Sequence, residues 1–165
     1  MTKQLYRVLA YLIAAGVALQ AAAIAYAVFR MFEWVSAGGI IDKALIESDN
    51  PQIGGITGFH LHQLVGVTIL PLLALLFLIS SFFARIPGGI KWALIVFATT
   101  LLQSLLGIFA HESSAVGWLH GATALILFTG AVVSGSRVHR VMANRPLSSA
   151  QPESAPVTGS AGQVS

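Results

Sequence analysis

The sequence predicts an all-α membrane protein, a four-helix up-down transmembrane bundle with its N- and C-termini on the cytoplasmic side. Hydrophobic residues make up 56% of the 165 residues and charged residues 9%, whereas soluble domains carry about a quarter charged residues. Four apolar runs, at 8–29, 64–84, 92–110 and 115–135, contain no Lys, Arg, Asp or Glu. Each is close to the ~20 residues that a helix needs to cross a bilayer. The composition therefore favours a multi-pass protein of the cell membrane.

These runs define the expected elements. Helices are predicted at about 6–30, 58–84, 90–111 and 115–136 within a transmembrane domain over 1–140, and Pro71 is expected to bend the second helix. The first apolar run is longer than the 7–15 residues of a signal peptide, so it is expected to remain as a helix. The outer loop over 31–57 contains a stretch, 40–46, that suits a short amphipathic surface helix. The tail over 141–165 is rich in Ser, Pro, Gly and Ala and is expected to be disordered.

The basic residues set the expected orientation. Positively charged residues concentrate in cytoplasmic segments of membrane proteins. With the N-terminus inside, two basic residues lie outside, Arg30 and Lys43, and seven lie in the cytoplasm: Lys3, Arg7, Arg85, Lys91, Arg137, Arg140 and Arg145. The short links over 85–91 and 111–114 make successive helices antiparallel neighbours.

Composition also excludes several functions. The chain has no cysteine, so thiolate metal sites, disulfides and cysteine nucleophiles are absent. The basic residues form no stripe interleaved with aromatic residues, so no nucleic-acid partner is expected. No set of catalytic residues is predicted.

Histidine carries the predicted chemistry. The residues His60, His62, His111 and His120 map to the outer ends of three helices. His62 and His120 each lie about five residues into a helix, roughly 8 Å deep, and a buried ionisable residue in a membrane helix indicates function. In a sequential bundle these two helices face each other across the core. The sequence therefore predicts haem b with both imidazoles on its iron, as in six-coordinate electron-transfer haems.

Neighbouring small residues sharpen this prediction. His60 and His62 are about 200° apart around the helix, so only one points inward. His62 is favoured because Gly66 follows one turn later and leaves room for a ring. Gly121 stands beside His120, and Gln103, Gly107 and His111 share one face of the third helix. Glycine at such positions also allows close helix packing without any cofactor.

The motif around these residues resembles one four-helix half of the haem A synthase family. His62-Gln63-Leu64-Val65-Gly66 resembles the histidine segment of its second helix, residues 101–107 resemble its Leu-Gln-x-Leu-Leu-Gly signature, and residues 118–125 resemble its fourth-helix histidine segment. The chain is also similar to small bacterial four-helix membrane proteins. The resemblance implies haem iron bound by His62 and His120. Gly58 stands where the family's catalytic half has a carboxylate, and Gln63 replaces its usual arginine, so the resemblance implies haem holding rather than oxidation of a haem methyl group.

Two other functions remain open. The first is a non-catalytic helical subunit or scaffold, in which the histidines are incidental. The second is a divalent-metal site of His60, His62, His111 and Glu112, since imidazole with carboxylate suits zinc or copper. Gln20 and Gln103 are the only strongly polar side chains deeper in the runs, which argues against an ion path across the membrane.

The lipid bilayer is the expected partner, together with a redox partner that the sequence does not identify. A homodimer is also predicted, because the related family joins two four-helix halves in one chain. Its interface would use the small residues of the first helix, which let helices approach closely: Ala14, Ala15, Gly16, Ala18, Ala21, Ala22, Ala23 and Ala25. Packing of these alanines inside the monomer is the alternative.

Overall fold

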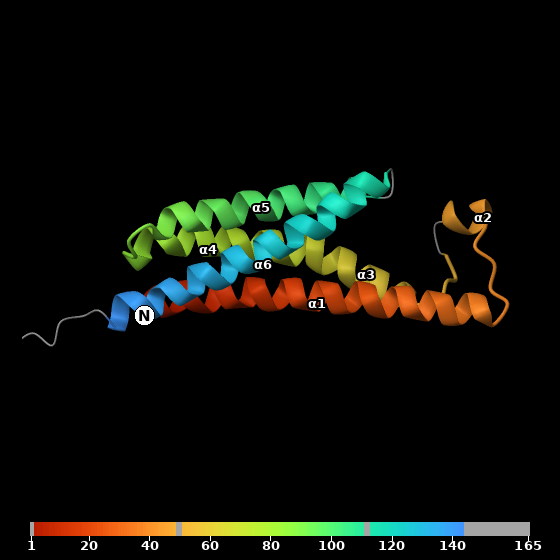
Figure 1. Cartoon of the computed structure of the whole chain (residues 1–165), viewed down its shortest axis with the longest axis horizontal. Coiled ribbons are helices and arrows are strands. Elements are labelled where there is room, and N and C mark those ends of the chain that lie inside the picture. The colour runs from red at the N-terminus through yellow and green to blue at the C-terminus, as the bar shows by residue number, and fades with distance from the viewer. Residues whose placement is uncertain (1, 49–50, 111–112, 144–165) are drawn as a thin grey trace, which may run out of the picture.

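The protein is a bundle of long helices (Figure 1). The computed structural model describes residues 2–48, 51–110 and 113–143, and within these ranges it contains helices and no strand. The elements in chain order are α1 (Thr2–Ser36), α2 (Lys43–Ile46), α3 (Ile56–Leu64), the π-helical turn η1 (Val65–Ile69), α4 (Leu70–Ala84), α5 (Gly89–Phe109) and α6 (Ser114–Ala143). The predicted all-α class with four long apolar helices is confirmed.

Four segments are long and apolar enough to cross a membrane, as a multi-pass membrane protein requires: Thr2–Ser36, Ile56–Ala84, Gly89–Phe109 and Ser114–Val138. The first is longer than the predicted 6–30. Its C-terminal extension is held by the Arg30–Glu33 ion pair and by Ser36 Oγ, which donates to the carbonyl of Phe32 at 2.9 Å. Such local bonds carry a helix beyond its apolar run.

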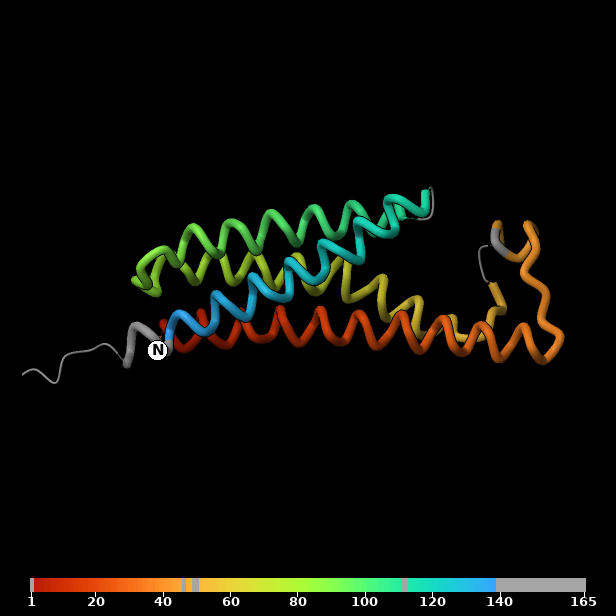
Figure 2. Tube along the Cα trace, in the orientation of Figure 1, coloured from red at the N-terminus to blue at the C-terminus, as the bar shows by residue number. Residues whose placement is uncertain are grey.

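The helices follow one another around the bundle. α1 packs against α3, α4 and α6, and α5 packs against α4 and α6. In the part of the chain that the structure describes, neither α1 and α5 nor α4 and α6 come within 8 Å between Cα atoms. These pairs are therefore the diagonals, as a sequential up-down order predicts. Figure 2 shows the start of α1 and the end of α6 at the same end of the bundle.

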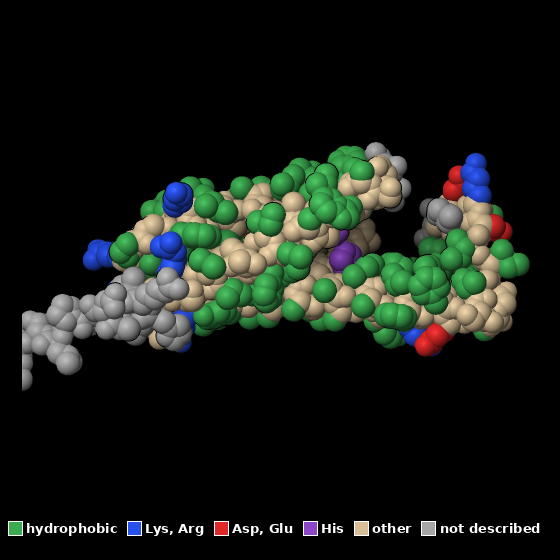
Figure 3. All heavy atoms as spheres, in the orientation of Figure 1, with side chains coloured by type: hydrophobic (Ala, Val, Ile, Leu, Met, Phe, Trp, Pro, Cys, Tyr) green, Lys and Arg blue, Asp and Glu red, His purple; other side chains and the backbone are tan. Residues whose placement is uncertain are grey.

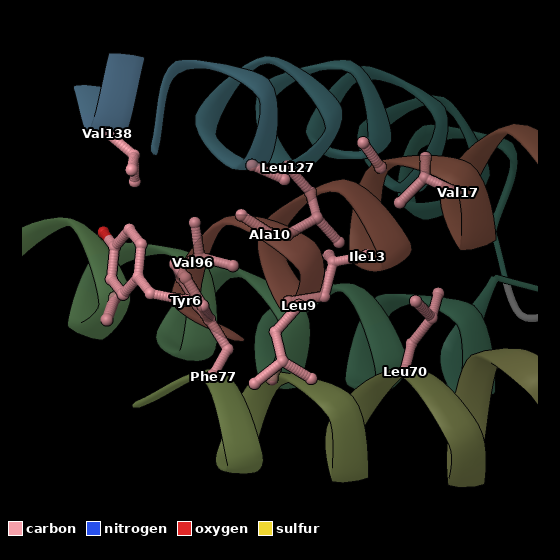
Figure 4. Close-up of a cluster of buried hydrophobic side chains, with 14 of the residues drawn as sticks. Tyr6, Leu9, Ala10, Ile13, Val17, Leu70, Phe77, Val96, Leu127 and Val138 are labelled. Atoms are coloured by element: carbon pink, nitrogen blue, oxygen red, sulfur yellow. The ribbon is translucent and has the colours of Figure 1, made fainter. Parts of the chain in front are cut away.

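The apolar core lies toward that end (Figure 4). The rings of Tyr6 and Phe77 are fully buried, with centroids 4.5 Å apart, and the Tyr6 hydroxyl donates to the carbonyl of Gly89 at 3.2 Å. Leu127 and Val138 of α6 close the core from the other side. At the opposite end the pair α5–α6 diverges from the pair α1–α3 (Figure 2). The bundle is thus tightly packed at one end and splayed at the other.

A π-helical turn interrupts the second span, where the sequence predicts a bend at Pro71. η1 ends with the Leu70 amide donating to the carbonyl of Val65, a spacing of five residues. Proline lacks an amide hydrogen, and its ring collides with the carbonyl four residues earlier in a regular helix. The wide turn directly before Pro71 is consistent with that constraint, and π-turns often occur at functional sites.

The loop between α1 and α3 folds back over the end of α1. A Cβ on Gly54 would lie 2.4 Å from the Cβ of Trp34, so this glycine permits the close approach. The predicted surface helix over 40–46 is shorter in the structure. It begins after Asp42, whose side chain caps it by accepting from the Leu45 amide at 2.8 Å. The predicted tail falls outside the described residues from 144 onward.

The alanine-rich face of α1 is divided between core and surface. Ala14 and Ala23 are buried, and a Cβ on Gly16 would lie 2.7 Å from Leu70 Cδ2. The other members of the set are exposed: Ala15, Ala18, Ala21, Ala22 and Ala25. Part of the set therefore packs inside the monomer, and the homodimer stays a prediction.

Candidate functional site

The candidate site lies at the splayed end of the bundle and contains two histidine rings. His62 comes from α3 and His120 from α6, and both side chains are half-buried. Their ring centroids are 6.0 Å apart and their planes are inclined at 68°. Figure 3 shows histidine atoms in a hollow between α6 and the long helix α1. The structure thus brings together two residues that are 58 positions apart in the sequence.

Each ring is held through the same nitrogen. His62 Nδ1 lies 3.1 Å from the Gln20 carbonyl oxygen in α1, and His120 Nδ1 lies 3.1 Å from the Gln103 carbonyl oxygen in α5. A carbonyl oxygen only accepts hydrogen bonds, so His62 Nδ1 carries the proton when it bonds to Gln20, and Nε2 is then the unprotonated nitrogen of the neutral ring. His120 Nδ1 lies 3.1 Å both from the Gln103 carbonyl oxygen, which accepts, and from the Gln103 side-chain amide nitrogen, which donates, so these contacts do not select one tautomer. Each neutral imidazole has one unprotonated nitrogen, whose lone pair can bind a metal.

His120 is held a second time by the side chain of Gln103. Gln103 Nε2 donates to the His120 carbonyl at 2.9 Å, and the Thr123 hydroxyl donates to Gln103 Oε1. The amide nitrogen also lies 3.1 Å from His120 Nδ1 and 3.4 Å from His120 Nε2, so it stands beside both ring nitrogens. The main chain and side chain of one glutamine therefore fix the position of His120.

The predicted glycines have three different environments. A Cβ on Gly107 would lie 3.0 Å from His120 Cε1, so the absence of a side chain at Gly107 leaves room for the histidine ring. A Cβ on Gly66 would lie 2.7 Å from Gln20 Nε2, so the space at Gly66 is taken by the glutamine. A Cβ on Gly121 would meet nothing within 4 Å. Gly121 therefore faces open space beside His120.

The remaining histidines do not join this pair among the described residues. His60 is exposed on α3, and the two-residue spacing from His62 turns it to another face of the helix. His111 and Glu112, which the alternative metal site requires, lie outside the described residues. Within the ranges that the structure describes, no three His, Asp or Glu side chains gather as a metal site.

Sequence reasoning did not assign a role to Gln20. This residue is 8% exposed, and its Oε1 is buried without a hydrogen-bond partner. Its side chain fills the space at Gly66, where Ser104 of α5 also donates to the Gly66 carbonyl at 2.9 Å. The sequence feature that could have identified Gln20 is its strongly polar side chain inside an otherwise apolar run.

Glycines also dock α3 onto α1. A Cβ on Gly55 would lie 2.3 Å from the Ala27 carbonyl oxygen, and one on Gly58 would lie 2.8 Å from the Ala23 carbonyl oxygen. Gly58 is therefore a buried helix contact with no room for a side chain.

Comparison of the chain with protein-family models, curated proteins and solved structures gives no significant match.

Proposed function

We propose that the chain holds haem b at the splayed end of the bundle, with His62 and His120 as the axial ligands of the iron. The observation that carries this proposal is the pair of rings, 6.0 Å apart, whose Nδ1 atoms each lie 3.1 Å from a main-chain carbonyl oxygen. Metal-binding histidines typically donate their second ring nitrogen to such an acceptor, which fixes the ring and leaves the other nitrogen for the metal.

The centroid separation matches the value for one metal ion held between two rings. Two metal–nitrogen bonds of about 2 Å, extended on each side to the centre of the ring, give centroids about 6 Å apart when both nitrogens face the metal. Haem supplies four nitrogens of its own, so two imidazoles complete a six-coordinate iron. The pair therefore has the number of protein ligands that haem iron takes.

The surroundings suit a flat, largely apolar group. Gly121, next to His120 in the chain, has open space where a side chain would stand, and Figure 3 shows the histidine atoms in a hollow between α6 and α1. Haem supplies one-electron redox chemistry when it is bound. The chain binds and orients it, and Gln103 and Gln20 hold the two ligands. Electron transfer or haem holding is the proposed activity, and one half of the haem A synthase family is the proposed relationship.

An absorption spectrum tests this function. The protein purified in detergent from haem-replete cells is expected to be red, with a Soret band and sharp α and β bands after reduction, because two imidazoles give low-spin iron. A colourless protein that takes up no added haemin would overturn the proposal and favour the scaffold alternative.

We also propose that both termini are cytoplasmic in the cell membrane and that the histidine pair lies toward the outer face. The positive-inside distribution supports this orientation. Reporter fusions after Arg145 and at Pro87 are expected to read cytoplasmic, and a fusion near Asn50 is expected to read external. A C-terminal reporter outside would reverse the bundle and move the histidine pair to the opposite leaflet.

A further inference from the structure

A second candidate site lies at the tightly packed end, between the start of α1 and the end of α4. It is a surface hollow of about 570 Å³. The residues that line it are Thr2, Lys3, Phe82, Phe83, Ala84 and Arg85. The hollow thus combines two cationic side chains with two aromatic rings.

Among the residues that the structure describes, no acidic side chain lies near these cations. The acidic residues that the structure describes are Glu33, Asp42 and Glu47, and all three belong to the opposite end of the molecule. Figure 3 shows this separation, with the blue side chains of one end unaccompanied by red. The hollow therefore has a positive charge that an anionic ligand would neutralise.

Arg85 occupies an unusual backbone position. Its φ of 49° is the only positive φ of a non-glycine residue in the described ranges. It caps the C-terminus of α4 in the left-handed region, where glycine is the favoured residue because it has no Cβ. The left-handed turn therefore carries a charged side chain at a position where the backbone alone favours glycine.

The walls indicate what kind of anion fits. Phe82 is 58% exposed and Phe83 is 65% exposed, and both lie in the last turn of a membrane-length helix. Two aromatic rings directly beside Lys3 and Arg85 offer apolar surface next to positive charge. An anionic headgroup with an acyl chain matches both halves of this surface, whereas a soluble anion matches only one.

We propose that Lys3 and Arg85 bind the headgroup of an anionic phospholipid, with its acyl chain along Phe82 and Phe83. The lipid belongs to the leaflet at the basic end of the bundle. This site is separate from the histidine pair and does not depend on haem. Its effect is to anchor the start of α1 to the end of α4 through a shared lipid.

The test is a titration of the full-length protein in neutral detergent with phosphatidylglycerol, with phosphatidylcholine as the uncharged comparison. Native mass spectrometry counts the retained lipids, and thermal unfolding follows the stabilisation. Lys3→Gln and Arg85→Gly are each expected to weaken phosphatidylglycerol binding about fivefold, which corresponds to about 1 kcal/mol for each basic residue near a membrane surface. The double variant is expected to lose about 25-fold, and phosphatidylcholine binding is expected to stay unchanged.

Arg85→Gly removes the positive charge without straining the backbone, because glycine accepts the left-handed conformation. The fold is therefore expected to persist without lipid. Lys91→Gln is the matched control, since Lys91 is exposed at the same end but does not line the hollow. An equal loss in Lys91→Gln would show diffuse attraction and overturn the site. Equal stabilisation by inorganic phosphate would show an anion site without a lipid, and would overturn the acyl-chain assignment.

Discussion

Replacing His62 or His120 by alanine is expected to abolish six-coordinate low-spin haem in the purified protein. Each substitution removes one axial nitrogen, so the iron becomes five-coordinate or the haem is lost. The reduced spectrum is expected to lose its sharp α and β bands, and low-temperature electron paramagnetic resonance is expected to show high-spin iron in any haem that remains. Among the predictions, this one has the largest expected effect on the proposed function.

His60→Ala is the matched control, because His60 is exposed on the same helix only two residues from His62. It is expected to leave the spectrum nearly unchanged. The Gln20 and Gln103 carbonyls lie inside helices, so the loss of a histidine leaves no buried carbonyl without a main-chain donor, and circular dichroism is expected to show an intact bundle. If His60→Ala removes the low-spin signal while His62→Ala retains it, the ligand assignment is wrong.

The four long helices were predictable because they depend on local composition. Twenty consecutive apolar residues have one stable solution in a bilayer, a helix whose backbone bonds are all internal. The different environments of His60 and His62 were also predictable, because the helical repeat alone separates residues two positions apart. Both inferences need only residues that are close together in the sequence.

The interactions that hold the two rings were not predictable, because each joins residues from different helices. The carbonyl that accepts from His62 belongs to Gln20, 42 positions away, and that of His120 belongs to Gln103, 17 positions away. The sequence suggested that Gly66 makes room for a ring, whereas the structure fills that space with Gln20. A glycine shows that something approaches closely, but its neighbour is decided by packing.

The last prediction concerns Gly55, the N-cap residue directly before α3. Gly55 has a φ of 85°, and a Cβ there would lie 2.3 Å from the Ala27 carbonyl oxygen and 2.9 Å from the Ala27 Cα. Gly55→Ala is expected to combine left-handed strain of about 1–2 kcal/mol with overpacking of about 1–3 kcal/mol. Since both contacts are with backbone, α3 must move away from α1. That movement is expected to break the His62–Gln20 hydrogen bond and to lower haem affinity as well as stability.

Gly38→Ala separates these two contributions. Gly38 also has a positive φ, 99°, but a Cβ there would meet nothing within 4 Å. Gly38→Ala is therefore expected to introduce the backbone strain without the steric overlap. The unfolding midpoint is expected to fall less than in Gly55→Ala, and the haem spectrum is expected to stay unchanged. Thermal unfolding in detergent and haemin titration measure both effects. Equal destabilisation by the two substitutions would mean that the contact of Gly55 with α1 contributes nothing, and that α3 is positioned by its other contacts.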